Sequence, residues 1–118
     1  MIKLLKGEIT NRKFIIIDCR FPYEFEAGHI KNAKNIYTPT MLEEFLIKKP
    51  IENVLIIFHC EYSQMRAPKM YRFLREIDRK IHVHSYPKLF YPNLYILEGG
   101  YREFFKFEGA KVFLIFYF

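Results

Sequence analysis

A cysteine and an arginine with five residues between them stand in the middle of the chain, in the stretch FHCEYSQMRAP from Phe58 to Pro68. The cysteine, Cys60, is one of only two in 118 residues. It follows an apolar run and precedes a segment with helical spacing, so we expect it in a loop that leaves a strand and enters a helix. Backbone N–H groups of such a loop and the helix N-terminus stabilise an anion. Cys60 is therefore predicted to be a thiolate nucleophile beside an oxyanion site.

Arg66 closes this loop. Its planar guanidinium can donate two parallel hydrogen bonds to a bound phosphate and neutralise charge during phosphoryl transfer. The competing interpretation is a buried structural cysteine near an unrelated arginine, and the flanking strand and helix favour the catalytic one. The predicted phosphate-binding loop comprises Glu61, Tyr62, Ser63, Gln64, Met65 and Arg66.

The segments around this loop predict the elements that position it. Short continuous apolar runs at 14–18, at 53–59 and near Leu94 are typical of strands that are covered on both faces. Segments 41–49 and 67–80 have apolar residues at helical spacing. This alternation predicts a small α/β domain around a mainly parallel sheet, and ligands bind at the carboxyl ends of the strands in such folds. The whole chain, 1–118, is predicted to be a single domain.

The composition narrows the class of protein. A net charge of +6 without a basic tract interleaved with aromatic residues argues against a nucleic-acid partner. The apolar runs are shorter than the ~20 residues that cross a bilayer, so we expect no membrane partner. No apolar segment of signal-peptide length follows the first lysines, and two cysteines are too few for a disulfide framework. We therefore expect an intracellular protein, in the cytoplasm or the nucleus.

The loop HCEYSQMR, 59–66, resembles the active-site loop of the Cdc25 phosphatases, which have a rhodanese-like fold and activate cyclin-dependent kinases. The resemblance continues through DCRFPYEFEAGHIKNA (18–33), YRFLREIDRK (71–80) and SYPKLFYPNLYILEGGYREFF (85–105), and so covers most of the chain. It implies a rhodanese-like α/β domain with helices flanking the sheet. It also implies a dual-specificity phosphatase that acts, without a cofactor or metal, on phosphotyrosine and phosphothreonine of a cyclin-dependent kinase with its cyclin. The reaction would pass through a phosphocysteine and promote mitotic entry.

The acid that protonates the leaving group is the open point of this mechanism. Glu61 is the candidate in the loop, and the resemblance retains it. The family usually has a second glutamate immediately before the loop arginine, where this chain has Met65. A solvated Glu61 and a proton brought by the substrate remain possible instead.

A second polar group lies between the first strand and the segments that follow it: Asp18, Arg20, Glu24 and His29. We interpret these residues as structural partners for one another rather than as a proton relay. His59, at the end of a strand, should point away from the nucleophile and orient the loop. His82 and His84 are too few to predict a metal site, and we expect them on the surface.

The resemblance implies roles for residues outside the loop. A cysteine at the position of Cys19 can form a disulfide with the nucleophile in the family, although a small core residue is the simpler interpretation from sequence alone. Arg75, Arg79 and Tyr86 match family positions that dock the kinase remotely from the active site. With Arg72, the two arginines are predicted to form an exposed basic face of the second helix.

Other functions remain open at this stage. Rhodanese-type sulfurtransferases have a loop that is one residue shorter, so the five residues here favour a tetrahedral oxyanion. Some short Cdc25-like proteins use the same loop to reduce arsenate. A non-catalytic kinase-binding module is the third possibility, if Met65 costs the loop its activity. The apolar tail GAKVFLIFYF is expected to pack as a core or edge strand.

Overall fold

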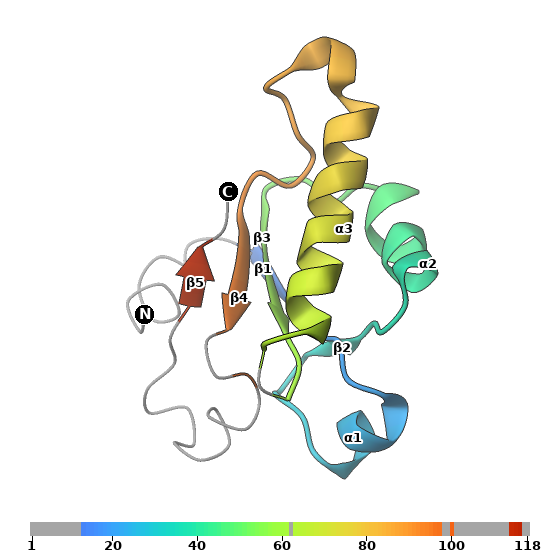
Figure 1. Cartoon of the computed structure of the whole chain (residues 1–118), viewed down its shortest axis with the longest axis vertical. Coiled ribbons are helices and arrows are strands. Elements are labelled where there is room, and N and C mark those ends of the chain that lie inside the picture. The colour runs from blue at the N-terminus through green and yellow to red at the C-terminus, as the bar shows by residue number, and fades with distance from the viewer. Residues whose placement is uncertain (1–12, 62, 98–99, 101–113, 117–118) are drawn as a thin grey trace.

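The computed structural model describes residues 13–61, 63–97, 100 and 114–116. Within these residues, the strands form one sheet in the order β2-β1-β3-β4-β5 (Figure 1). Their bounds are β1 Lys13–Asp18, β2 Lys34–Asn35, β3 Val54–His59, β4 Leu94–Leu97 and β5 Leu114–Phe116. The first four strands pair in parallel and β5 pairs antiparallel with β4. The predicted mainly parallel sheet is confirmed.

The described helices are α1 Pro22–Ala27, α2 Pro39–Leu42, the π-helical turn η3 Glu43–Ile47, α3 Arg66–Ile81 and the short 3-10 turn η4 Val83–Ser85. The predicted helices at 41–49 and 67–80 correspond to α2 with η3 and to α3. The first of them begins two residues earlier than predicted because the Thr38 side chain caps it, accepting the backbone N–H of Met41 at 3.2 Å. The sequence did not predict α1, β2 or η4, because elements this short show no apolar period.

β3 is the centre of the core, and all six of its residues are buried. Val54, Ile56 and Phe58 face a large apolar cluster that includes residues of α3, whereas Leu55 and Ile57 belong to a second cluster. Since neighbouring strand residues point to opposite faces, the two clusters lie on opposite faces of the sheet. The amphipathic α3 covers the first face (Figure 1). A loop, residues 60–65, joins the carboxyl end of β3 to the start of α3.

The segment before β4 is fastened to α3 by one buried carboxylate. Asp78 accepts the backbone N–H groups of Phe90 and Tyr91, both at 2.9 Å, and its side chain lies 3.0 Å from Nδ1 of His82. The prediction that His82 is a surface residue is wrong, because it is only 8% exposed beside Asp78. His84 is exposed, as expected.

The apolar C-terminal segment contributes an edge strand, since β5 is the last strand of the sheet order within the described residues. The rest of the tail, 109–113 and 117–118, lies outside them. No helix in the described part of the chain has the length and apolarity needed to cross a membrane.

Candidate active site

The candidate nucleophile lies where β3 ends. Cys60 directly follows the strand and is 3% exposed. Its Sγ accepts a hydrogen bond from the backbone N–H of Ala67, at 3.4 Å. Ala67 is the second residue of α3, so this N–H belongs to the positive end of the helix. A negative charge on the sulfur is stabilised by that arrangement.

Arg66 begins α3, and its guanidinium is held by the first turn of α1. Nη1 and Nη2 of Arg66 donate to the two carboxylate oxygens of Glu24, at 2.7 and 3.3 Å. The guanidinium carbon also lies 5.5 Å from the centre of the Phe21 ring. The hydrogen bond from Arg66 lowers the pKa of Glu24, and Glu24 in turn raises the pKa of Arg66. This pair joins residues 42 positions apart and was not predicted from the sequence.

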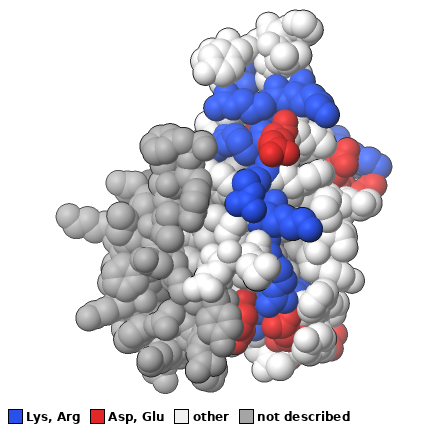
Figure 2. Space-filling view, viewed as in Figure 1, with Lys and Arg blue, Asp and Glu red and all other residues white. Residues whose placement is uncertain are grey.

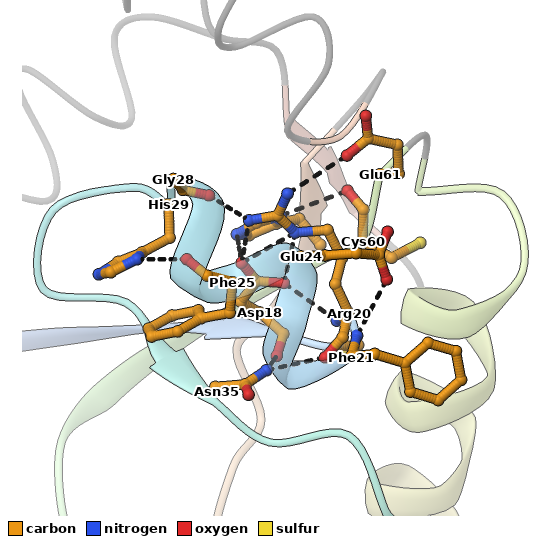
Figure 3. A network of polar contacts seen from close by, with 12 residues as sticks. Asp18, Arg20, Phe21, Glu24, Phe25, Gly28, His29, Asn35, Cys60 and Glu61 are labelled. Carbon is orange, nitrogen blue, oxygen red and sulfur yellow. Dashed lines mark hydrogen bonds and ion pairs between the residues drawn. The ribbon is translucent and has the colours of Figure 1, made fainter.

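A second ion-pair network supports the loop from the other side (Figure 3). The buried Asp18 accepts from Nε and Nη2 of Arg20, at 3.0 and 2.7 Å. Nη2 of Arg20 also donates to the carbonyl oxygen of Gly28 at 2.7 Å, and Nη1 to the Glu61 carboxylate at 3.3 Å. Asp18 and Arg20 are therefore structural partners, as we interpreted them. Their link to Glu61 was not predicted.

His29 does not lie with the carboxylates that are its neighbours in the sequence. Its Nδ1 is 2.8 Å from the carbonyl oxygen of Phe25, one turn earlier in the chain. The imidazole also stacks on the Phe25 ring, with the two ring centres 3.6 Å apart. Figure 3 shows the imidazole pointing away from Arg20 and Glu61. His29 therefore packs on the end of α1 and takes no part in the network, which corrects the predicted grouping.

The middle of the loop exposes some residues and buries others. Ser63 has a positive φ of 56°, which lets the chain turn sharply within the loop. Its hydroxyl oxygen is buried and has no hydrogen-bond partner among the described residues. Gln64 and Met65 are exposed, and Tyr62 lies outside the described residues. The Ser63 hydroxyl is thus available to an oxygen of a ligand.

His59 stands on the opposite face of β3 from Cys60, by the alternation of a strand. Its Nδ1 is 3.3 Å from the carbonyl oxygen of Cys60, and its Nε2 is 3.8 Å from the Asp18 carboxylate. Burial lowers the pKa of His59, which favours the neutral ring at neutral pH. The contacts fit the expectation that His59 orients the loop.

Cys19 directly follows β1, at the position that corresponds to that of Cys60 after β3. Asp18 pairs with His59 in the parallel register, and the backbone N–H of Cys19 donates to the His59 carbonyl at 2.8 Å. Both cysteines are free thiols in one apolar cluster. Burial raises the pKa of Cys19, and the charges of Cys60 and Asp18 raise it further. The strand spacing of about 4.8 Å suits a disulfide, so the redox pairing stays a prediction with compatible geometry.

Of the predicted docking residues, Arg75 and Arg79 lie in the second half of α3, and Tyr86 follows η4 beyond the end of that helix. Figure 2 shows Lys and Arg side chains gathered along this helix. The Arg79 guanidinium lies 5.3 Å from the ring centre of Tyr86, which is 74% exposed. Arg75 differs from the expected exposed face, because it is half-buried and donates to the carbonyl oxygens of Tyr91 and Pro92, at 3.0 and 3.2 Å. Arg72 is exposed.

Comparison with known proteins identifies the family. The rhodanese-like domain family matches residues 1–106, so the chain belongs to this family. It is 51% identical over 112 residues to M-phase inducer phosphatase 1 of Rattus norvegicus, covering 89% of this chain and 21% of that protein. It is 48% identical over 119 residues to the M-phase inducer phosphatase of Drosophila melanogaster, covering 88% of this chain and 25% of that protein. The predicted resemblance to Cdc25 phosphatases is confirmed, and the chain spans a quarter or less of these relatives.

Two solved structures share the fold. An As–Sb reductase from Leishmania major aligns with a TM-score of 0.66 and 25% identity, covering 98% of this chain and 86% of that one. A rhodanese-related protein from Thermoplasma volcanium aligns with a TM-score of 0.57 and 21% identity, covering 90% and 88% of the two chains. The predicted rhodanese-like fold is confirmed.

Proposed function

We propose that this chain is the catalytic domain of a cysteine-dependent, dual-specificity protein phosphatase. The observation that carries the proposal is the contact of the Cys60 thiol with the Ala67 N–H at the start of α3, next to Arg66. A nucleophile, a helix N-terminus and a guanidinium thus converge at one end of the sheet. The names of the relatives, M-phase inducer phosphatases, support the same activity and a role in the cell cycle.

The reaction follows from these groups. The Cys60 thiolate attacks phosphorus, forming an S–P bond while the bond from phosphorus to the serine, threonine or tyrosine oxygen breaks. The departing oxygen keeps the electron pair and takes a proton. Arg66 and the loop N–H groups stabilise the charge on the phosphoryl oxygens in the transition state. Water then hydrolyses the phosphocysteine, releasing phosphate and the free thiol.

In our proposal, Glu61 is not the acid that protonates the leaving group. Nη1 of Arg20 donates to Oε1 of Glu61 at 3.3 Å, and this contact ties the loop to the buried ion pair of Arg20 and Asp18. We propose that Glu61 orders the loop through Arg20 and that the substrate's own phosphate supplies the leaving-group proton. Glu61→Gln should then keep a substantial part of the turnover, whereas loss as complete as that in a nucleophile variant would identify Glu61 as the acid.

The proposed substrate is the phosphorylated form of a cyclin-dependent kinase with its cyclin. Support comes from the relatives' names and from the exposed pair of Arg79, on α3, and Tyr86, which follows η4; a protein partner can contact this pair. We also propose an intracellular location, because both cysteines are free thiols that a reducing compartment preserves.

Arsenate reduction is the second candidate function. The As–Sb reductase from Leishmania major covers almost the whole chain at 25% identity, which favours arsenate reduction over a non-catalytic kinase-binding module. Arsenate is a tetrahedral oxyanion like phosphate, so the same loop would bind it. Its reduction to arsenite would consume two electrons, which two molecules of an added thiol such as glutathione supply as they form a disulfide and the arsenate loses one oxygen as water.

One experiment tests the two functions together. Wild type, Cys60→Ser and Arg66→Lys are assayed for hydrolysis of p-nitrophenyl phosphate and, separately, for arsenate reduction with glutathione. We expect aryl phosphate turnover that Cys60→Ser abolishes and that Arg66→Lys largely loses, because an ammonium cannot replace the planar fork. Full turnover by Cys60→Ser, or arsenate reduction without phosphatase activity, would overturn the proposal.

A further inference from the structure

Two residues at the start of α1, Glu24 and the N-cap residue Phe21, contact the guanidinium of Arg66. Oε1 of Glu24 accepts both the backbone N–H of Phe21, at 3.0 Å, and Nη1 of Arg66, at 2.7 Å. The Glu24 carboxylate is therefore fixed by its own helix before it binds the arginine. The guanidinium carbon also lies over the Phe21 ring, 5.5 Å from its centre, which adds a cation–π contact.

The pair leaves part of Arg66 available to a ligand. A guanidinium carries five N–H donors, and the two bonds to Glu24 occupy one on each terminal nitrogen. The N–H on Nε and the second N–H of each terminal nitrogen can still point at phosphoryl oxygens. Glu24 can thus hold Arg66 while Arg66 binds the substrate.

We propose that Glu24 is a positioning residue for the phosphate-binding arginine: α1 presets Arg66 through this carboxylate for the transition state of phosphoryl transfer. The inference rests on the proposed phosphatase function and names a residue that the predicted loop does not contain. Pre-organisation matters because a long, flexible arginine otherwise loses side-chain entropy when it meets the transition state. The lowered pKa of Glu24 is consistent with a carboxylate that stays charged throughout the neutral range.

The opposite role for Glu24 is competition. A carboxylate on the arginine could repel an incoming dianion and occupy donors that the substrate needs. The two roles differ in kinetics, because removal of a competitor lowers KM and leaves or raises kcat. Loss of positioning lowers kcat, since it weakens an interaction that matters most in the transition state.

The test is a double-mutant cycle with p-nitrophenyl phosphate as the substrate. Glu24→Ala, Glu24→Gln, Arg66→Lys and the double variant Glu24→Ala/Arg66→Lys are compared with wild type. Glu26→Ala is the matched control, since Glu26 is an exposed glutamate on the same helix. We expect Glu24→Ala to lower kcat about tenfold with little change in KM, and Glu24→Gln to retain more activity. In the Arg66→Lys background the loss should shrink to about twofold or less.

Equal fold-losses in both arginine backgrounds would mean that Glu24 only supports the fold, and a lower KM with an unchanged or raised kcat would mean competition. Either result overturns the proposal.

A second readout needs no turnover: in the ligand-free protein, NMR of the Arg66 side-chain nitrogens should show faster guanidinium rotation in Glu24→Ala than in wild type or Glu26→Ala. Unchanged rotation would sink the positioning role by itself. Absence of wild-type hydrolysis would instead refute the phosphatase function and leave the NMR result to decide on Glu24.

Discussion

Gly100 lies directly against the backbone of Cys60. A β-carbon on Gly100 would collide with the carbonyl oxygen of Cys60 and would come within 2.6 Å of the carbonyl oxygen of Glu61. Gly100 also has a φ of +64°, which other residues adopt only with strain. The glycine therefore lets a distant part of the chain pack against the start of the phosphate-binding loop.

The first prediction follows from that contact. Gly100→Ala should lower kcat/KM for p-nitrophenyl phosphate by about tenfold or more, because the loop must shift to make room for the methyl group. Steady-state kinetics measures the loss, and cooperative thermal unfolding shows whether the domain still folds. Wild-type kinetics in a folded Gly100→Ala protein would mean that the loop is not held by this contact.

The second prediction concerns oxidation of the two cysteines. Mild peroxide should convert the Cys60 thiolate to a sulfenic acid, which Cys19 then attacks, forming a disulfide and releasing water. Mass spectrometry should find the intramolecular disulfide, and a thiol reductant should restore activity. The Cys19→Ser variant should instead pass to the irreversible sulfinic acid under the same dose. Equal recovery of the variant and the wild type would leave Cys19 as a core residue only.

The third prediction separates docking from chemistry on α3. Arg79→Ala should lower activity on a phosphorylated cyclin-dependent kinase about tenfold and leave hydrolysis of p-nitrophenyl phosphate near wild type, because Arg79 meets Tyr86 far from the loop. Lys80→Ala is the control, since it removes the same charge from a neighbouring exposed position. If Lys80→Ala costs as much, general charge attraction and not docking accounts for the effect.

A fourth prediction concerns Arg75, which holds the carbonyl oxygens of Tyr91 and Pro92. Arg75→Ala should lower the free energy of unfolding by about 1–3 kcal/mol, because it removes two charge-assisted hydrogen bonds, one of them to the part-buried carbonyl oxygen of Tyr91. Urea denaturation measures this loss. If Arg75→Ala is as stable as wild type, the two hydrogen bonds do not stabilise the fold. Arg75 would then keep only the docking role that the sequence predicts.

The fifth prediction is a pH dependence of stability. The pKa of His59 is lowered in the folded protein by burial, so below its unfolded pKa of about 6.5 the unfolded chain binds a proton that the folded chain does not. Stability should therefore fall as the pH drops from about 6.5 towards the folded pKa, by up to about 1.4 kcal/mol per pH unit. Urea denaturation between about pH 7.5 and 5.5 should show a shallower dependence in His59→Asn. An identical slope in the variant would assign the effect to other groups.

Local patterns in the sequence predict the framework of this domain. The continuous apolar run before Cys60 and the helical spacing after Arg66 were enough to locate β3 and α3, and with them the candidate nucleophile at a helix N-terminus. These elements are long, and their periodicity comes from burial, which the residue types reveal directly.

Such local patterns could not predict the ion pairs of the site. Glu24 and Arg66 are 42 positions apart, and Arg20 and Glu61 are 41 apart. Charged residues carry no periodic signal, and each could have paired with several others once the chain folded. Glu24 was grouped with Asp18 and Arg20 because they are close in sequence, but α1, too short to predict, turns its carboxylate towards Arg66. Only the relative placement of α1 and α3 selects this partner.

The parallel register of β1 and β3 has a consequence for how this chain can change in evolution. Asp18 lies beside His59, so Cys19 and Cys60 follow on the same side of the sheet. One residue inserted into β1 would exchange its two faces, turning the Cys19 thiol away and bringing an acidic side chain towards the nucleophile. Insertions in the segments between the strands do not change which residues of β1 face each side of the sheet. Chains that retain both cysteines should therefore vary in the length of their loops but not in the length of β1.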